Sequence, residues 1–110
     1  MPFEVTLFDF KNEGIHITIT ARFEGEDLIV EGYDIGKTVE ESWGDSDYEY
    51  SRTVRMEHIP KLCELLQCDP TDKEAILNEV AKRFNGNYSY SEFTDFLTEH
   101  GIENEGFTWA

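Results

Sequence analysis

Hydrophobic and polar residues alternate along the first half of the chain with a period of two, which is the pattern of β-strands. The clearest case is the segment 15–23, where one face carries only hydrophobic residues and the other carries polar ones. Similar segments at residues 3–10, 28–35 and 48–55 predict three further strands. Short connections give antiparallel neighbours, so we expect these four strands to form a meander.

Two positions disturb the alternation. In the first predicted strand the hydrophobic residues divide between the two faces, with Phe3, Val5 and Leu7 on one and Phe8 and Phe10 on the other. This division predicts burial on both sides of the strand at its far end. Gly32 interrupts the third strand, which predicts either a weakened strand or a bulge.

The pattern changes to helical spacing after residue 58. Hydrophobic residues from Ile59 to Leu66 predict a first helix, and a second follows the capping-box sequence Thr71-Asp72-Lys73-Glu74. The sequence Ser89-Tyr90-Ser91-Glu92 is expected to cap a third helix that ends at Gly101. Residues 102–109 are hydrophobic enough that we expect them to pack on the fold or to form a short strand.

Strands come first and helices second, an order typical of the α+β class. We therefore expect residues 1–110 to form a single α+β domain. Its predicted architecture is a four-stranded antiparallel meander followed by about three helices packed on one face, with a short C-terminal strand or packed tail. The composition supports a folded core, since 39% of the 110 residues are hydrophobic and 14% are aromatic.

The charge of the chain is strongly negative. It has 24 Asp and Glu residues against nine Lys and Arg residues, a formal net charge of -15. Such a surface repels nucleic-acid phosphates and anionic lipids, so we expect neither nucleic acid nor a membrane as partner. It attracts basic proteins, although acidic composition also serves solubility alone.

Acidic and aromatic residues concentrate in the segment 40–50, around a predicted hairpin tip at 44–47. Trp and Tyr supply rigid contact area and carboxylates steer a basic partner, so this segment is the predicted interaction surface. An alternative is that the rings are cross-strand pairs that hold the hairpin together. The predicted contact residues are Glu40, Glu41, Trp43, Asp45, Asp47, Tyr48, Glu49 and Tyr50.

The sequence contains no complete motif of the common catalytic or metal-binding kinds. The spacing of Asp45, Asp47 and Glu49 resembles the start of a calcium loop, but Tyr50 and Met56 occupy the positions where such a loop needs Gly and Glu. No nucleophile elbow, zinc motif or phosphate-binding glycine loop occurs. We therefore predict no catalytic residue, no metal and no cofactor.

Two cysteines, Cys63 and Cys68, lie five positions apart, which is not the spacing of a CxxC motif. We expect both thiols to be free and to lie on different faces of the chain. No hydrophobic leader or membrane-spanning run occurs, so the expected location is the cytoplasm.

The sequence also carries a resemblance. The runs at 31–37 and 39–50 and the ending 93–109 resemble a small family of bacterial proteins of about this length that has no assigned activity. The most specific piece is Trp-Gly-Asp-Ser-Asp-Tyr-Glu-Tyr at 43–50. The resemblance implies a bacterial, cytosolic, single-domain protein. In size and charge the chain is also similar to immunity proteins that neutralise bacterial toxins.

These observations favour a non-enzymatic protein that acts by protein–protein contact. The concrete form of this hypothesis is an immunity-like or antitoxin-like inhibitor of a basic partner. Two alternatives stay open: a small enzyme or ligand-binding protein with an acidic pocket, and a homo-oligomeric structural protein that uses the strand 15–23 or the tail as an edge.

Overall fold

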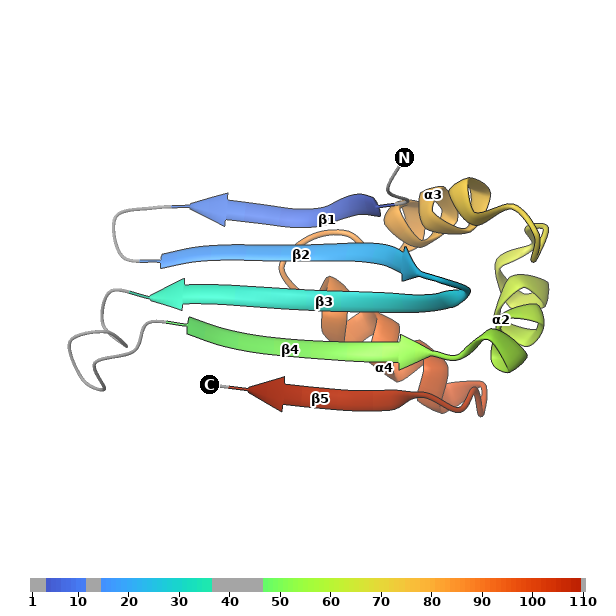
Figure 1. The fold of residues 1–110 in the computed structure, drawn as a ribbon. Helices are drawn as coiled ribbons and strands as arrows, with labels where there is room; N and C mark the ends of the chain where they lie inside the picture. Colours follow the sequence, from blue (N-terminus) through green and yellow to red (C-terminus); the bar gives the residue numbers. More distant parts are fainter. Residues whose placement is uncertain (1–3, 12–14, 37–46, 110) are drawn as a thin grey trace.

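A computed structural model describes residues 4–11, 15–36 and 47–109. Within these ranges the strands form one antiparallel sheet in the order β1-β2-β3-β4-β5 (Figure 1). Their bounds are β1 Glu4–Lys11, β2 Ile15–Glu24, β3 Asp27–Gly36, β4 Asp47–Val54 and β5 Glu105–Trp109. The predicted meander is thus confirmed, and the hydrophobic tail forms a fifth strand beside β4.

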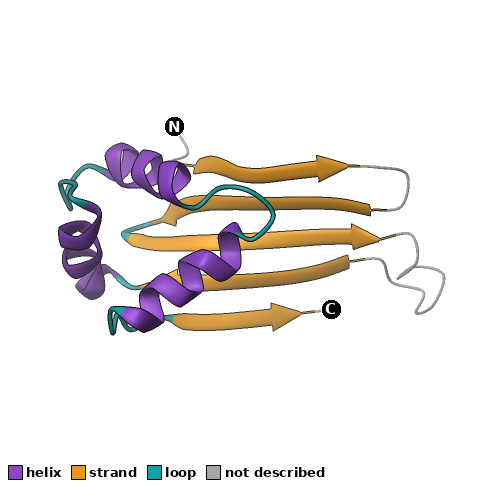
Figure 2. Cartoon of the chain, turned by 180° about the vertical axis from the view of Figure 1, so that it is seen from behind, coloured by secondary structure: helices purple, strands orange, loops and turns teal. Residues whose placement is uncertain are grey.

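The helices follow β4 and are η1 Met56–His58, α2 Ile59–Leu66, α3 Lys73–Arg83 and α4 Ser89–Glu99. Figure 2 shows α3 and α4 on one face of the sheet, with α2 at the end where β4 finishes. The helix face and the opposite, open face of the sheet are therefore distinct. This arrangement of helices on one face of an antiparallel sheet confirms the predicted α+β class.

The hydrophobic core lies between the sheet and the helices. The sheet supplies Ile19, Ala21, Leu28, Val30 and Val54, each no more than 1% exposed. The helices cover these with fully buried leucine, isoleucine, valine and phenylalanine side chains, among them Leu62, Leu66, Ile76, Val80, Phe93 and Leu97. Burial of this apolar surface is the main force that holds the sheet against the helices.

A bulge in β1 explains its two competing hydrophobic patterns. Val5 lies opposite Ala21 and Phe8 lies opposite Ile19, so β1 has one more residue than β2 over this interval, with Leu7 at the shift. Residues directly opposite each other in an antiparallel pair share a face, so Val5, Phe8 and Phe10 all face the helices. Burial on both sides of the far end, which the sequence predicted, is therefore wrong.

The two edges of the sheet differ. The carbonyl of Leu7 in β1 accepts a 3.2 Å hydrogen bond from the amide of Gly86, so the loop between α3 and α4 covers part of that edge. β5 forms the other edge and is fixed to the end of β4 by Arg55, whose guanidinium donates to both carboxylate oxygens of Glu105. This ion pair links two segments that are far apart in the sequence.

The helix starts differ in detail from the predicted caps. Asp72, not Thr71, caps α3, because its Oδ1 accepts a 3.0 Å hydrogen bond from the amide of Ala75. Thr71 instead donates its hydroxyl to Asp69. The cap position of α4 is Tyr88, without a side-chain hydrogen bond, and Ser89 lies fully buried in the first turn.

The cysteines also lie differently from the prediction. Gln67 ends α2 in the left-handed conformation with φ of 61°, which turns the chain back so that the amide of Cys68 donates to the carbonyl of Cys63. Both thiols are free and contact each other, and burial raises the pKa of Cys63 to about 12. A thiol held as far from ionisation as that of Cys63 is a poor nucleophile.

No helix in the described part of the chain is long and apolar enough to cross a membrane.

Candidate interaction surface

The sheet is longer than the helix layer that covers it. Figure 2 shows that the strand ends at which β1 and β3 finish project beyond the helices. At this projecting end, four residues that are directly opposed in register lie side by side on the helix face: Phe10, Ile17, Asp34 and Tyr48. We call these four residues the outer row.

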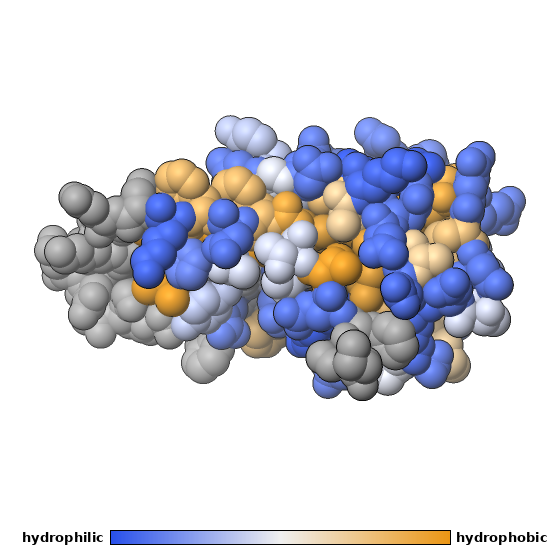
Figure 3. Space-filling view, turned by 90° about the horizontal axis from the view of Figure 1, so that it is seen from above, coloured by the Kyte–Doolittle hydropathy of each residue, from blue (hydrophilic) through white to orange (hydrophobic). Residues whose placement is uncertain are grey.

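The outer row is partly open to solvent, in contrast to the core. Phe10 is 43% exposed and Tyr48 is 40% exposed, whereas Ile19, the next helix-face residue of β2 after Ile17, is 1% exposed. Ile17 and Asp34 lie between these extremes. Along the β1 edge, Figure 3 shows hydrophobic side chains that reach the surface among many hydrophilic ones. Aromatic and aliphatic surface of this kind is typical of contact sites.

Tyr50 forms the boundary between the outer row and the core. Its ring crosses from β4 to β3 and lies directly over Gly32, where a Cβ atom would overlap the ring. Gly32 therefore makes room for an aromatic side chain, and the register of β3 is continuous at this position, without the bulge that the sequence allowed. The ring of Tyr90 in α4 packs edge-on against the Tyr50 ring, with the two ring centroids 4.6 Å apart. The centroid of the Tyr48 ring lies 5.6 Å from that of Tyr50.

Asp34 is the charged member of the outer row. Its Oδ1 accepts a 3.1 Å hydrogen bond from the hydroxyl of Tyr50. Desolvation raises the pKa of the Asp34 carboxyl, and the bond from Tyr50 offsets this only in part. The pKa of Tyr50 is raised as well, first by desolvation and then by the negative charge of Asp34. Among the described residues no cationic side chain pairs with Asp34.

Three of the predicted contact residues have side chains in the described part of the chain, and these three lie on both faces of β4. Glu40, Glu41, Trp43 and Asp45 lie outside the described residues, and the side chain of Asp47 does too. Tyr48 and Tyr50 point to the helix face. Glu49 belongs to the open face, opposite Tyr33 of β3 and Trp109 of β5 in register.

Sequence reasoning missed three members of the outer row: Phe10, Ile17 and Asp34. They come from three strands and are brought together by register alone. Asp34 could have been noticed from the sequence, because the other residues on its face of β3 are hydrophobic or glycine. An acidic residue on a core-facing register position is unusual enough to mark a site.

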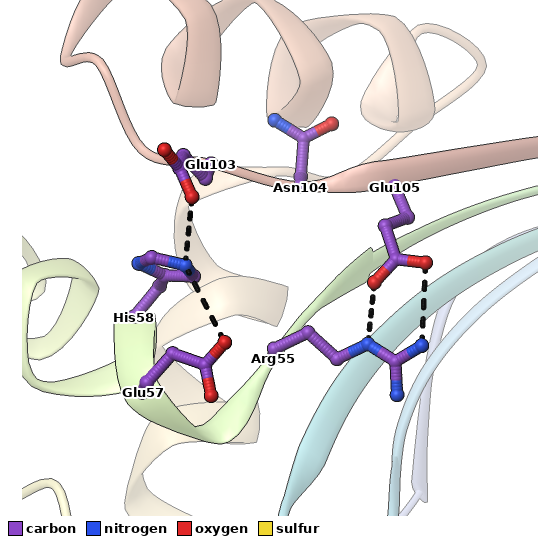
Figure 4. A pocket seen from close by; sticks show the side chains of 6 residues that line it. All are labelled: Arg55, Glu57, His58, Glu103, Asn104 and Glu105. Carbon is purple, nitrogen blue, oxygen red and sulfur yellow. Dashed lines mark hydrogen bonds and ion pairs between the residues drawn. The ribbon is translucent and has the colours of Figure 1, made fainter.

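A second site lies at the opposite end of the molecule. A recess of about 140 Å³ forms where β4 leads into η1 and where the chain returns to β5 (Figure 4). Its lining residues are Arg55, Glu57, His58, Glu103, Asn104 and Glu105.

Most of the polar side chains that line this recess already have partners. The hydrogen bonds from Arg55 lower the pKa of Glu105, and Nε2 of His58 lies 3.1 Å from Oε2 of Glu103 and 3.8 Å from Oε1 of Glu57. The side chains of Glu103 and Glu57 are 82% and 70% exposed, so both carboxylates keep most of their hydration. In the described ranges no three His, Cys, Asp or Glu side chains are grouped so that they could hold a metal ion.

Comparisons with known proteins leave the site to be judged on its own chemistry, because no family model, no curated protein and no solved structure matches the chain.

Proposed function

We propose that this chain is a non-enzymatic protein that binds a basic protein partner, with the outer row as part of the contact surface. An immunity-like or antitoxin-like inhibitor of a cationic toxin or nuclease is the specific form of this proposal. The observation that carries it is the outer row itself: the Asp34 carboxylate lies between Ile17 and the partly exposed ring of Tyr48, the exposed ring of Phe10 ends the row, and no described residue gives Asp34 a cationic partner.

The charge of the whole chain supports the same class of partner. A formal net charge of -15 accelerates the approach of a cationic protein and slows the approach of an acidic one. Rigid rings then supply the contact area, since tyrosine side chains lose little conformational entropy on binding. Acidic residues on an inhibitor also imitate the phosphates that a nuclease recognises.

An enzymatic alternative would place its chemistry in the recess of Figure 4, which holds three carboxylates and one histidine. Two observations make it the weaker candidate. Glu105 is bound to Arg55 and its pKa is lowered, which disfavours a role as general acid. Glu103 and Glu57 are highly exposed, whereas catalytic carboxylates are tuned by burial.

The experiment is a capture of binding proteins from a bacterial lysate on the immobilised chain, followed by calorimetry with the purified partner. The informative variant is Phe10→Ser in the outer row. Its matched control is Phe107→Ser, because Phe107 is 60% exposed but belongs to β5 and the open face.

The expected partner is basic and its affinity falls as salt is added. Phe10→Ser should lower the affinity about tenfold or more, and Phe107→Ser should leave it unchanged. A partner whose binding both substitutions weaken equally, an acidic partner, or no specific partner would each contradict the proposal.

A further inference from the structure

We propose that Asp34 is the docking site for an arginine side chain of the partner, with the guanidinium stacked on the ring of Tyr48. This inference rests on the function proposed above and makes it specific, because it names one residue of this chain and the chemistry that it recognises.

The position of Asp34 in the sheet provides the first argument. It stands at the centre of the outer row, with Ile17 of β2 on one side and Tyr48 of β4 on the other. A carboxylate between an aliphatic chain and an aromatic ring loses part of its hydration, and no described cation replaces that hydration. A partner that brings a positive charge therefore gains a favourable interaction here that a neutral partner does not.

The hydrogen bond from Tyr50 provides the second argument. It engages Oδ1 of Asp34 at 3.1 Å, and the described chain gives Oδ2 no hydrogen-bond donor. Tyr50 is itself fixed by Gly32 beneath its ring and by Tyr90 at its edge. The carboxylate is thus held in a defined orientation before any ligand arrives, which lowers the entropic cost of binding.

Arginine fits this arrangement better than lysine. Its planar guanidinium carries five N–H donors in a fixed fork, so it can donate to Oδ2 while its face lies against an aromatic ring. Tyr48 presents such a ring, 40% exposed and next to Asp34 in register. A lysine ammonium is more strongly hydrated and gains less from contact with the ring.

The test is a ¹H–¹⁵N NMR titration with the capped tripeptide acetyl-Gly-Arg-Gly-amide. Peptides with Lys or Gln in place of Arg serve as comparison ligands. The informative variant is Asp34→Asn, which removes the charge but keeps an oxygen that accepts from Tyr50. The matched control is Glu49→Gln, which removes the same charge from the open face of the adjacent strand.

For the wild type we expect saturable shifts of the amide signals of Ile17, Asp34 and Tyr48. Affinity should decrease in the order Arg, Lys, Gln. A hydrogen bond to a charged group is worth about 1.5–3 kcal/mol, so Asp34→Asn should weaken arginine binding about tenfold or more. Glu49→Gln should leave the affinity unchanged, and Tyr48→Leu should weaken it while Asp34 is intact.

Three outcomes would overturn the inference. Equal losses in Asp34→Asn and Glu49→Gln would mean that the peptide responds only to net charge. Shifts that fail to saturate or that avoid the outer row would mean that no arginine site exists there. With the purified partner, binding that survives Asp34→Asn but is lost in Phe10→Ser would refute the arginine site and leave the proposed function standing.

Discussion

The protonation state of Asp34, a residue of the outer row, also affects the free energy of unfolding of the protein. Partial burial raises the pKa of its carboxyl above the ordinary value of 3.8, so the folded state holds the proton more tightly than the unfolded state does. The ionised form therefore opposes folding. This cost is absent below the unfolded pKa and complete above the folded pKa, so the free energy of unfolding falls as the pH rises through that window.

The substitution Asp34→Asn removes this titration and keeps an acceptor for Tyr50. The variant should be at least as stable as the wild type at pH 7, and its advantage should shrink as the pH is lowered toward 3.8, the ordinary pKa of the carboxyl. Urea denaturation of both proteins across this range measures the difference. An advantage that stays constant with pH, or that grows in acid, would show that Asp34 is not destabilised by burial.

At the scale of the strand, Gly32 and Tyr50 form a matched pair across β3 and β4. A Cβ at position 32 would overlap the Tyr50 ring, so Gly32→Ala must displace the ring and with it the hydroxyl that orients Asp34. Such overpacking costs about 1–3 kcal/mol. In a Tyr50→Ala background the ring is gone, so the same substitution should cost little or should stabilise the strand.

A double-mutant cycle by urea denaturation isolates this coupling. The coupling between positions 32 and 50 should account for most of the loss in Gly32→Ala. An equal cost of Gly32→Ala in both backgrounds would place its origin in backbone conformation instead. The presence of glycine at position 32 would then be unrelated to the Tyr50 ring on the helix face.

Element types followed from the sequence because periodicity reflects which face is buried, and β2 shows this most clearly. Finer features depended on contacts that the pattern does not encode. The extra residue at Leu7 moves Phe8 and Phe10 to the face that Val5 occupies, and a period-two reading cannot detect such a shift. The cap of α3 is Asp72, whereas the sequence pattern also allowed its neighbour Thr71. Two possible capping residues in succession leave the predicted helix start uncertain by one position.

The site was less predictable than the fold for a related reason. The chain segment 40–50 attracted attention because its residues are adjacent in sequence, but alternation along β4 sends Tyr48 and Glu49 to opposite faces. The outer row instead joins residues separated by up to 38 positions in sequence, from Phe10 to Tyr48, and only strand register brings them together. Register across several strands is a property of the folded sheet as a whole.

At the scale of the whole molecule, repulsion among acidic groups opposes folding. The chain has 24 acidic and nine basic residues, so at least 15 carboxylates would lack a basic side chain even if every Lys and Arg formed one pair. The described part of the chain contains ion pairs between partly exposed side chains, such as Arg22 with Glu24, Lys73 with Glu26 and Arg83 with Glu79. Exposed pairs of this kind contribute little to stability, so the net field of the molecule is repulsive.

Added salt should therefore stabilise the isolated protein. The Debye length shortens from about 30 Å at 0.01 M to about 8 Å at 0.15 M ionic strength, and the longest dimension of the molecule is 45 Å. Repulsion between distant carboxylates is screened over this range, whereas contacts such as the Arg55–Glu105 pair are screened less. The melting temperature should rise with sodium chloride, and the same salt should weaken a complex with a basic partner. A melting temperature that falls would mean that attractive pairs dominate, which would remove the electrostatic basis for a cationic partner.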